Sequence, residues 1–242
     1  MNVNNIDLLL RNNTGNKDKN NLIESFVIRT KPFTNIFNEI KLSKTDKPEQ
    51  NYLVIGQRGA GKTTLLYRLK YAIEDDPILK QTTIPVMFAE EQYHLMDLVN
   101  LWESIAEYLE DHDGFQSLSK EIESTDLSHA HREERVYELL EKKLLSNNKK
   151  IIVFIENIDV FFKKIGVPGQ KRLREVLTTS TSIRLICSAT TYFDGVISYS
   201  DPFYEFFKIV RLDGLNKAES KKLLLKLGEQ KNELQQIQNI VE

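Results

Sequence analysis

The chain alternates between short continuous apolar runs and longer segments whose apolar residues recur at helical spacing. Apolar runs of strand length occupy residues 52–56, 83–90, 149–159, 182–190 and 206–215. Segments with helical spacing lie between them, at residues 62–74, 95–110, 133–145 and 170–179. Continuous apolar runs indicate strands buried on both faces, as in a parallel sheet. The alternation therefore predicts an α/β fold of three layers, in which helices cover both faces of a five-stranded parallel sheet.

The two ends of the chain differ from this alternating core. The first 25 residues are polar apart from a short apolar patch at residues 6–10, and a short helix is expected from Pro32 to about Leu42. Near the other end, residues 216–230 show a further helical pattern, which Asn216 is well placed to cap. The chain therefore divides into a polar segment, a core and a C-terminal helical segment, at residues 1–25, 26–212 and 213–242.

The corner between the first strand and its helix has the sequence GQRGAGKTT, which matches G-x-x-x-x-G-K-[ST]. Glycines permit the unusual backbone dihedrals and the close approach that let several N–H groups converge on one anion. The new helix adds its positive N-terminal end. Lys62 reaches the outer phosphates, and the Thr63 hydroxyl ligates Mg²⁺. The predicted phosphate-binding residues are Gly56, Gln57, Arg58, Gly59, Ala60, Gly61, Lys62, Thr63 and Thr64.

A phosphate loop of this kind calls for an acid at the end of another strand, where it completes the magnesium shell. In the run IIVFIENID, Glu156 follows five apolar residues and is the first candidate. Asp159 is the reserve, although the strand should have ended before it. The alternative interpretation is that Glu156 only terminates its strand.

Composition limits the remaining classes of function. The chain has 242 residues with a net charge of −2, so no overall positive field attracts it to nucleic acid or to an anionic membrane. A single cysteine, Cys187, lies in an apolar run and is expected to be a buried thiol in a reducing compartment. No apolar run approaches the roughly 20 residues of a membrane span. We therefore expect a cytoplasmic protein.

With these motifs in place, the sequence resembles AAA+-type ATPases, in particular the branch of the origin-recognition initiators and the related STAND signalling ATPases. The resemblance extends from about residue 26 to the end of the chain. It rests on the phosphate loop and on looser matches to the segments ESFVIRTKPFTNIFNEI, CSATTYF and LDGLNKAESKKLLLKLG. It implies that ATP and Mg²⁺ are the cofactors and that residues 213–242 begin a helical lid.

The same resemblance implies roles for residues outside the phosphate loop. Phe26, Ile28 and Arg29 lie where the family places its adenine-contacting segment, so they are expected to flank the base. Thr190 matches the polar sensor at the tip of the fourth strand, which detects the γ-phosphate, and Ser188 is the next candidate.

One departure from the family concerns catalysis. The family has Asp-Glu after the third strand, and here the pair is Glu156-Asn157. An amide cannot act as a general base near neutral pH. The second strand ends in Glu90 and Glu91, where relatives often have Asn, so the two residue types could have exchanged places. In that hypothesis Glu90 or Glu91 orients the attacking water and Asn157 positions it. In the alternative, hydrolysis is slow or requires a partner that completes the site.

A second departure is that the sequence ends about 30 residues into the expected lid. We expect it to be the ATPase portion of a longer protein whose further regions contact DNA or a protein partner. A homo-oligomer is compatible with the resemblance, and the candidates for a trans-acting cation are Arg58, Lys171, Arg172, Arg174 and Arg211.

The sequence thus supports a nucleotide-controlled switch or motor that binds and hydrolyses ATP, with a DNA-related, defence or signalling role. The alternative is a low-turnover ATP-binding scaffold or adaptor. A small-molecule kinase is a third class, but it requires an arginine-rich substrate lid that the sequence does not clearly contain.

Overall fold

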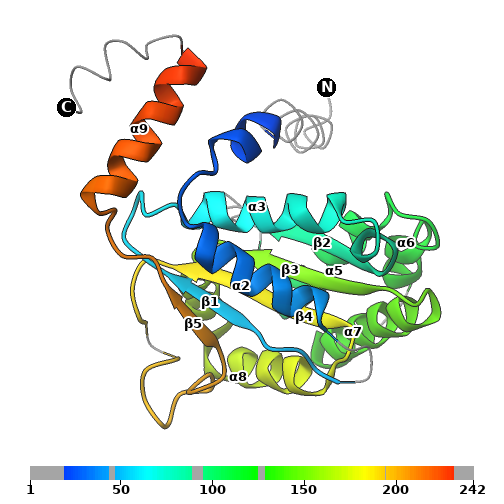
Figure 1. Cartoon of the computed structure of the whole chain (residues 1–242). Coiled ribbons are helices and arrows are strands. Elements are labelled where there is room, and N and C mark those ends of the chain that lie inside the picture. Colours follow the sequence, from blue (N-terminus) through cyan, green and yellow to red (C-terminus); the bar gives the residue numbers. More distant parts are fainter. Residues whose placement is uncertain (1–18, 44–46, 89–94, 125–128, 194, 232–242) are drawn as a thin grey trace, which may run out of the picture.

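A computed structural model describes residues 19–43, 47–88, 95–124, 129–193 and 195–231 (Figure 1). Five parallel strands form one sheet in the order β2-β3-β4-β1-β5. The strands are β1 (Tyr52–Ile55), β2 (Thr83–Phe88), β3 (Lys150–Ile155), β4 (Ile183–Ala189) and β5 (Lys208–Arg211). The predicted five-stranded parallel sheet is therefore confirmed.

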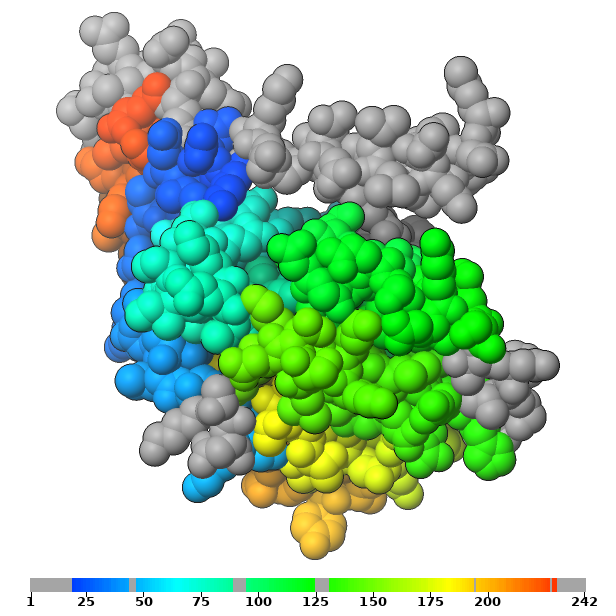
Figure 2. Space-filling model, turned by 90° about the vertical axis from the view of Figure 1, so that its right-hand side faces the viewer, coloured from blue at the N-terminus to red at the C-terminus, as the bar shows by residue number. Residues whose placement is uncertain are grey.

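Helices cover both faces of this sheet. Residues 19–25 are helical. The later helices are α2 (Thr30–Lys41), α3 (Lys62–Asp75), α4 (Leu79–Thr82), α5 (Leu98–Leu109), α6 (Leu118–Glu123), α7 (His129–Ser146), α8 (Ile158–Thr179) and α9 (Lys217–Lys231). Two separate buried clusters lie on opposite faces, one shared with α5 to α8 and one with α2 to α4. The α5 to α7 region forms a continuous surface over one side of the molecule (Figure 2). This arrangement is the predicted three-layer α/β fold.

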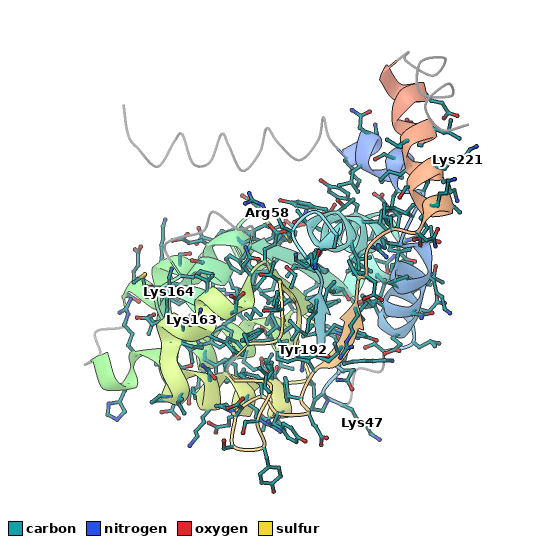
Figure 3. The ribbon with its side chains drawn as sticks, turned by 90° about the vertical axis from the view of Figure 1, so that its left-hand side faces the viewer. Lys47, Arg58, Lys163, Lys164, Tyr192 and Lys221 are labelled. Atoms are coloured by element: carbon teal, nitrogen blue, oxygen red, sulfur yellow. The ribbon has the colours of Figure 1, made fainter. Side chains whose placement is uncertain are left out.

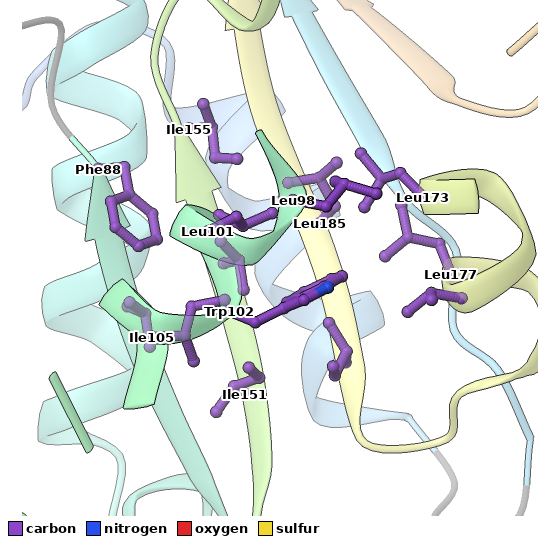
Figure 4. Close-up of a cluster of buried hydrophobic side chains, with 14 of the residues drawn as sticks. Phe88, Leu98, Leu101, Trp102, Ile105, Ile151, Ile155, Leu173, Leu177 and Leu185 are labelled. Carbon is purple, nitrogen blue, oxygen red and sulfur yellow. The ribbon is translucent and has the colours of Figure 1, made fainter. Parts of the chain in front are cut away.

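Alternate residues of the central strands enter the two clusters, as a pleated strand requires. In β1, Leu53 and Ile55 join the cluster under α5 to α8, whereas Tyr52 and Val54 join the other. The larger cluster centres on Trp102 of α5, which lies among aliphatic side chains from β3, β4, α5 and α8 (Figure 4). The Trp102 indole is 1% exposed, and its Nε1 donates a hydrogen bond of 2.7 Å to Glu133.

The strand order indicates which edge of the sheet can bind a ligand. β1 lies between β4 and β5, with Ile55 opposite both Ala189 and Arg211, and Ile155 of β3 lies opposite Cys187 of β4. All strands are parallel, so their carboxyl ends meet at one edge of the sheet. In α/β sheets ligands bind outside the carboxyl ends, at the point where the strand order reverses. The segments after β1, β3, β4 and β5 are therefore the candidates for a binding site.

Several predicted boundaries were wrong. The helix expected at residues 170–179 is the second part of α8, which follows a kink at Gly166 (φ 60°, ψ −177°) just before Pro168, whereas the helical part from Ile158 to this kink was not predicted. The aromatic segment before β5 forms turns, and Phe203 and Phe207 pack into the core. Residues 19–21, expected to be part of a polar segment without structure, lie in a helix. Gly166 and Pro168 explain the kink in α8, because glycine can adopt a positive φ and proline is tolerated in the first turn of a helix but not in its interior.

Two sequence expectations at the ends of elements are confirmed. Cys187 is fully buried, and burial raises the pKa of its thiol well above the ordinary value. Asn216 caps α9 in a reciprocal arrangement: its side-chain oxygen accepts a hydrogen bond from the Glu219 N–H (2.9 Å), while the Glu219 carboxylate accepts one from the Asn216 N–H (3.0 Å). Among the described residues, no helix is long and apolar enough to cross a bilayer.

Asp76 fixes the connection between α3 and α4 and makes a testable contribution to stability. Its carboxylate accepts hydrogen bonds from the Ile78 and Leu79 N–H groups, both at 3.0 Å, and lies 2.9 Å from the Lys41 ammonium. The Lys41 contact and then the Leu79 N–H lower the pKa of Asp76 from 3.8 to about 2. Because the folded-state pKa lies below the unfolded-state value, the stabilisation is present above pH 4 and is lost as the pH falls toward 2.

We therefore expect Asp76→Asn to lower the free energy of unfolding at pH 7 by about 1–2 kcal/mol. The difference between variant and wild type should shrink as the pH falls from about 4 to about 2. Urea denaturation across this range measures it. Asp75→Asn is the matched control, since Asp75 is exposed and forms a surface ion pair with Lys19, and it should cost less than about 0.5 kcal/mol. An equal effect of both substitutions at every pH would contradict this account.

Candidate nucleotide-binding site

The phosphate loop predicted from the sequence connects β1 to α3 through residues 56–61. Gly59 and Gly61 adopt left-handed backbone conformations, with φ of 80° and 89°. A Cβ at either position would meet no atom within 4 Å, so the backbone conformation rather than crowding favours glycine there. The Ala60 N–H donates to the Gln57 carbonyl (3.1 Å), which closes a tight turn. The helix α3 begins directly after this turn, and the first N–H groups of a helix have no partner within it.

Gly56 is required for a different reason, the close approach of the β5 segment. A Cβ at Gly56 would lie 2.7 Å from the Leu212 carbonyl oxygen and 3.0 Å from the Ala60 Cβ. The Gly56 N–H donates to the Ala189 carbonyl (3.3 Å), and the Leu212 N–H donates to the Ile55 carbonyl (2.7 Å). The first residue of the loop is therefore held between the ends of β4 and β5.

Lys62 crosses back over the loop that precedes it. Its ammonium donates hydrogen bonds to the Gly56 carbonyl (2.7 Å) and the Gln57 carbonyl (3.1 Å), and the residue is half-buried. Thr63 follows in the first turn of α3 and is exposed. The loop thus combines an ammonium group, a hydroxyl and the positive end of a helix, which together suit an anion with several oxygen atoms.

The loop opens into a cavity of about 490 Å³ at the carboxyl edge of the sheet. This volume is in the range of small-molecule sites. Among the described residues, three arginines and one aspartate line the cavity, and this excess of positive charge favours an anionic ligand. The lining residues are Arg29, Ile55, Gly56, Gln57, Arg58, Gly59, Ala60, Thr190, Thr191, Tyr192, Arg211, Leu212, Asp213, Gly214 and Leu215.

Tyr192 and Arg211 form a fixed pair on one wall of this cavity. The Tyr192 hydroxyl accepts hydrogen bonds from Nη2 (2.8 Å) and Nε (3.1 Å) of Arg211, and the guanidinium lies 5.2 Å from the ring centroid. The hydrogen bond to Tyr192 raises the pKa of Arg211. Figure 3 shows Arg58 and Tyr192 extending from the segments that follow β1 and β4. Tyr192 was not predicted, because nothing in the segment CSATTYF distinguishes its tyrosine from a packing residue.

The acid predicted at the end of the third strand is at the expected place. Glu156 is the first residue after β3, is half-buried, and its N–H donates to the Phe88 carbonyl (3.0 Å). Burial and then the Glu156 carboxylate raise the pKa of Tyr67, one turn after Thr63 on α3. The Glu156 carboxylate is therefore close enough to α3, the helix that begins at the phosphate loop, to influence the titration of Tyr67. Asp159 lies in the first turn of α8, beyond the end of the strand.

The oxygen donors at this edge fit a magnesium ion bound together with phosphates. Mg²⁺ in nucleotide sites uses one or two carboxylates or hydroxyls and completes its shell with phosphate oxygens and water. Thr63 and Glu156 are donors of this kind. Among the described residues, no group of three or more His, Cys, Asp or Glu side chains is arranged to hold a metal ion.

Asn157, which replaces the expected second acid, has a left-handed backbone conformation (φ 48°, ψ 53°) just before α8. Asparagine tolerates this conformation better than most residues. Its presence therefore has a backbone explanation that is independent of catalysis. Glu90 and Glu91, the proposed exchange partners, lie outside the described residues.

The remaining predicted residues are divided between the cavity and its surroundings. Arg29 and Thr190 line the cavity, whereas Phe26 and Ile28 are not among the lining residues. Phe26 packs edge-on against Phe33 of α2, with ring centroids 5.6 Å apart. Ser188 is 1% exposed within β4, so Thr190 is the more accessible of the two sensor candidates.

Three of the candidate trans-acting cations are engaged within the chain: Arg211, which pairs with Tyr192, and two arginines of α8. Arg172 forms ion pairs with Glu133 (2.9 Å) and Glu175 (3.0 Å). Arg174 donates hydrogen bonds to the carbonyl groups of Pro202 and Tyr204. Both arginines therefore have structural partners.

Comparison with known proteins identifies the fold. A scan against family models finds no match for the chain, and neither does a search of curated proteins. The ORC1 protein of Aeropyrum pernix, solved in complex with DNA, matches with a TM-score of 0.58 at 17% identity, over 84% of this chain and 50% of that one. Cdc6p from Pyrobaculum aerophilum matches with a TM-score of 0.59 at 14% identity, over 84% and 50%.

A third match is the Aeropyrum pernix ORC2 protein, solved as ADPNP–ADP complexes, with a TM-score of 0.59 at 13% identity, over 86% of this chain and 52% of that one. The chain thus spans about half the length of these proteins. At such identities the likeness concerns the fold. It confirms the resemblance inferred from the motifs: the chain has the α/β fold of the AAA+ P-loop domain found in the Orc1/Cdc6 proteins.

Proposed function

We propose that this domain binds ATP with Mg²⁺ at the residue 56–64 loop, hydrolyses it at the γ-phosphate and uses the nucleotide state to move α9. The observation that carries the proposal is the geometry of Lys62. Its ammonium is held by the Gly56 and Gln57 carbonyls, beside two left-handed glycines and the positive end of α3. An ammonium in this position can exchange carbonyl oxygens for phosphate oxygens with little movement.

Each residue of the loop has a distinct task in this proposal. The backbone N–H groups from Gly59 to Thr64 bind the β- and γ-phosphates, and Lys62 neutralises charge on the outer phosphates. Thr63 and Glu156 hold the metal shell. The bound magnesium ion would neutralise charge that develops on the phosphate oxygens. In this proposal Thr190, the residue after β4, contacts the γ-phosphate.

Activation of the attacking water is assigned to the segment after β2. The carboxylate of Glu90 or Glu91 accepts the proton or orients the water, and the Asn157 amide holds the water by hydrogen bonds. This assignment follows from the Glu156-Asn157 pair, which offers only one carboxylate at the end of β3.

We expect Glu90→Gln or Glu91→Gln to slow single-turnover ATP hydrolysis by about 100-fold, because a general base contributes roughly 10²–10⁴-fold. ATP affinity should stay within about threefold of the wild type, since neither residue contacts the phosphates in this account. Glu107→Gln is the control, because Glu107 lies exposed on α5. If both variants hydrolyse ATP at the wild-type rate, the exchange hypothesis is wrong.

A low-turnover ATP-binding scaffold is the second candidate. The left-handed conformation of Asn157 favours it, because the amide then serves the backbone and no base follows Glu156. A phosphate-release assay separates the two candidates, with Lys62→Ala as the inactive control. Release above the Lys62→Ala background supports the enzyme. Release at that background, with ATP binding intact, supports the scaffold.

In this proposal the output of the switch is the position of α9, which follows the segment 212–216 and extends away from the sheet (Figure 1). Nucleotide-dependent order in such a linker is a common basis of switching. The ORC1 match was solved with DNA, which makes DNA the first partner to test. DNA-stimulated turnover would indicate an initiator-like or transposition-like role, and its absence would favour signalling or defence.

A further inference from the structure

A second, smaller cavity lies at the opposite edge of the sheet, where β2, β3 and β4 begin. Its volume is about 120 Å³, roughly a quarter of that of the cavity at the phosphate loop. The lining comes from the starts of these strands, the end of α2 and α4. Because all five strands are parallel, their amino ends lie at the edge away from residues 56–64. The proposed triphosphate site does not use this cavity.

Arg184 is a deeply buried charge in the lining of this second cavity. It is the second residue of β4 and is 3% exposed. Its Nε donates a hydrogen bond to the Gln50 carbonyl (2.8 Å), and its Nη1 donates one to the Glu49 carboxylate (2.9 Å). Burial lowers the pKa of Arg184, although the Glu49 and Glu39 carboxylates act in the opposite direction. The surrounding groups therefore compensate the guanidinium charge incompletely.

Lys150, the first residue of β3, shares the carboxylate that holds Arg184. Its ammonium lies 2.7 Å from the other oxygen of Glu49, so one carboxylate serves two cations. Glu39, the other acid that acts on Arg184, forms an ion pair with Lys208. Among the described residues, three cationic side chains and one carboxylate line the cavity. Buried positive charge is costly unless an anion compensates it.

The lining calls for a ligand that accepts hydrogen bonds on several sides. Lysine and arginine side chains only donate, and the hydroxyl groups of Thr82 and Thr181 can donate as well. A tetrahedral oxyanion of the phosphate type presents acceptors in every direction and pairs well with arginine. The cavity is far larger than the roughly 10–15 Å³ that one water molecule needs. It is smaller than the roughly 300–1,000 Å³ of a site for a nucleotide-sized ligand.

We propose that the second cavity binds a free phosphate-type oxyanion between Arg184 and Lys150. The bound anion would join the starts of β3 and β4, the two strands to which these cations belong. Glu49 holds both cations in place before the anion arrives. This site is separate from the residue 56–64 loop, and the inference does not depend on the proposed function.

The test is an amide NMR titration of the wild type with inorganic phosphate, up to about 20 mM, at constant ionic strength. Because the phosphate loop is also an anion site, each site is followed by its own amide signals. The signals of residues 150–151 and 182–184 should shift saturably, with an apparent Kd of about 1–10 mM. Sodium chloride at the same ionic strength should leave them unchanged. If phosphate shifts only the signals of residues 56–64, or those of neither site, the proposal is wrong.

Substitutions assign the binding to the two cations. Lys150→Gln removes one charge at the end of a strand and should weaken phosphate binding about tenfold. Arg184→Lys keeps the charge but loses the planar fork, and it should also weaken binding about tenfold. Lys80→Gln is the matched control, because Lys80 is exposed on α4 outside the cavity lining, and it should change the Kd less than about twofold. Urea denaturation verifies that each variant is folded, and unaltered affinity in folded Lys150→Gln would overturn the assignment.

Two further arms define the ligand and separate this site from the nucleotide site. Sulfate should shift the signals of residues 182–184 as phosphate does, whereas AMP at the same concentration should shift them less, because the cavity is too small for its nucleoside. Larger shifts with AMP would show that the ligand is a phosphate ester and would overturn the proposal of a free oxyanion. Lys62→Ala should leave the phosphate titration of residues 182–184 unchanged, and loss of these shifts in that variant would contradict a separate site.

Discussion

Replacing Lys62 with alanine should weaken Mg-ATP binding about 100-fold, which corresponds to roughly 3 kcal/mol. The substitution removes charge-assisted hydrogen bonds to the outer phosphates, each worth about 1.5–3 kcal/mol. Titration calorimetry measures the affinity directly. In the unliganded domain the Lys62 ammonium donates hydrogen bonds to two carbonyls of its own loop, and their loss should lower the free energy of unfolding by about 1–2 kcal/mol.

The control for this experiment is another lysine on the same helix. Lys70 of α3 forms an ion pair with Glu74, one turn further along, and does not line the cavity. Lys70→Ala should therefore leave the ATP affinity within about twofold of the wild type. Unchanged ATP binding by Lys62→Ala would mean that the ammonium group has no part in holding the triphosphate, which would contradict the assigned role.

Replacing Trp102 with alanine should have the largest effect on stability, a loss of about 3–5 kcal/mol in the free energy of unfolding. The indole is 1% exposed, packs in the cluster between the sheet and α8, and lies 5.6 Å from the Tyr137 ring (Figure 4). Its removal leaves a cavity and takes one hydrogen bond from Glu133, which keeps its ion pair with Arg172. Urea denaturation with an unchanged m-value would measure the loss.

Two further variants calibrate this prediction. Trp102→Phe retains most of the ring volume, so it should lower the free energy of unfolding less than Trp102→Ala does. Val160→Ala alters a side chain that is 50% exposed on α8, so it should lower the free energy of unfolding by less than about 0.5 kcal/mol. A loss below about 1 kcal/mol for Trp102→Ala would indicate that the core under α5 is not packed as described.

The layout of the fold and the phosphate loop could be predicted because both depend on local sequence. The apolar run before Gly56, the left-handed positions at Gly59 and Gly61, and the cap at Asn216 each leave a signature within a few residues. Periodicity and turn chemistry are sufficient for such features. The first part of α8, before the kink at Gly166, was not predicted, because it starts at Ile158, only three residues after β3 ends at Ile155, and the two apolar patterns merge in the sequence.

The parts of the site that sequence reasoning missed are contacts between distant segments. The Arg29–Asp213 contact spans 184 positions and the Tyr192–Arg211 pair spans 19, and both exist only because the sheet order brings the ends of β1, β4 and β5 together. No local pattern encodes such contacts. The resemblance to a family placed Arg29 near the base but offered no reason to connect it with Asp213.

Asn157 has one interpretation from the sequence and another from the structure. From the sequence, the residue is an amide in place of a catalytic acid. In the structure it occupies a left-handed position at the start of α8 that asparagine tolerates well. Asn157 therefore needs no catalytic role to explain its presence, and kinetic measurements on the Glu90 and Glu91 variants decide between the enzyme and the scaffold.

The most direct test of the central claim, that the residue 56–64 loop binds a triphosphate, is titration calorimetry of the purified domain with Mg-ATP. The account predicts saturable heat with about one nucleotide per chain, reduced about 100-fold in affinity by Lys62→Ala. No heat from ATP or GTP at concentrations up to about 1 mM, a range that covers typical nucleotide sites, would contradict it.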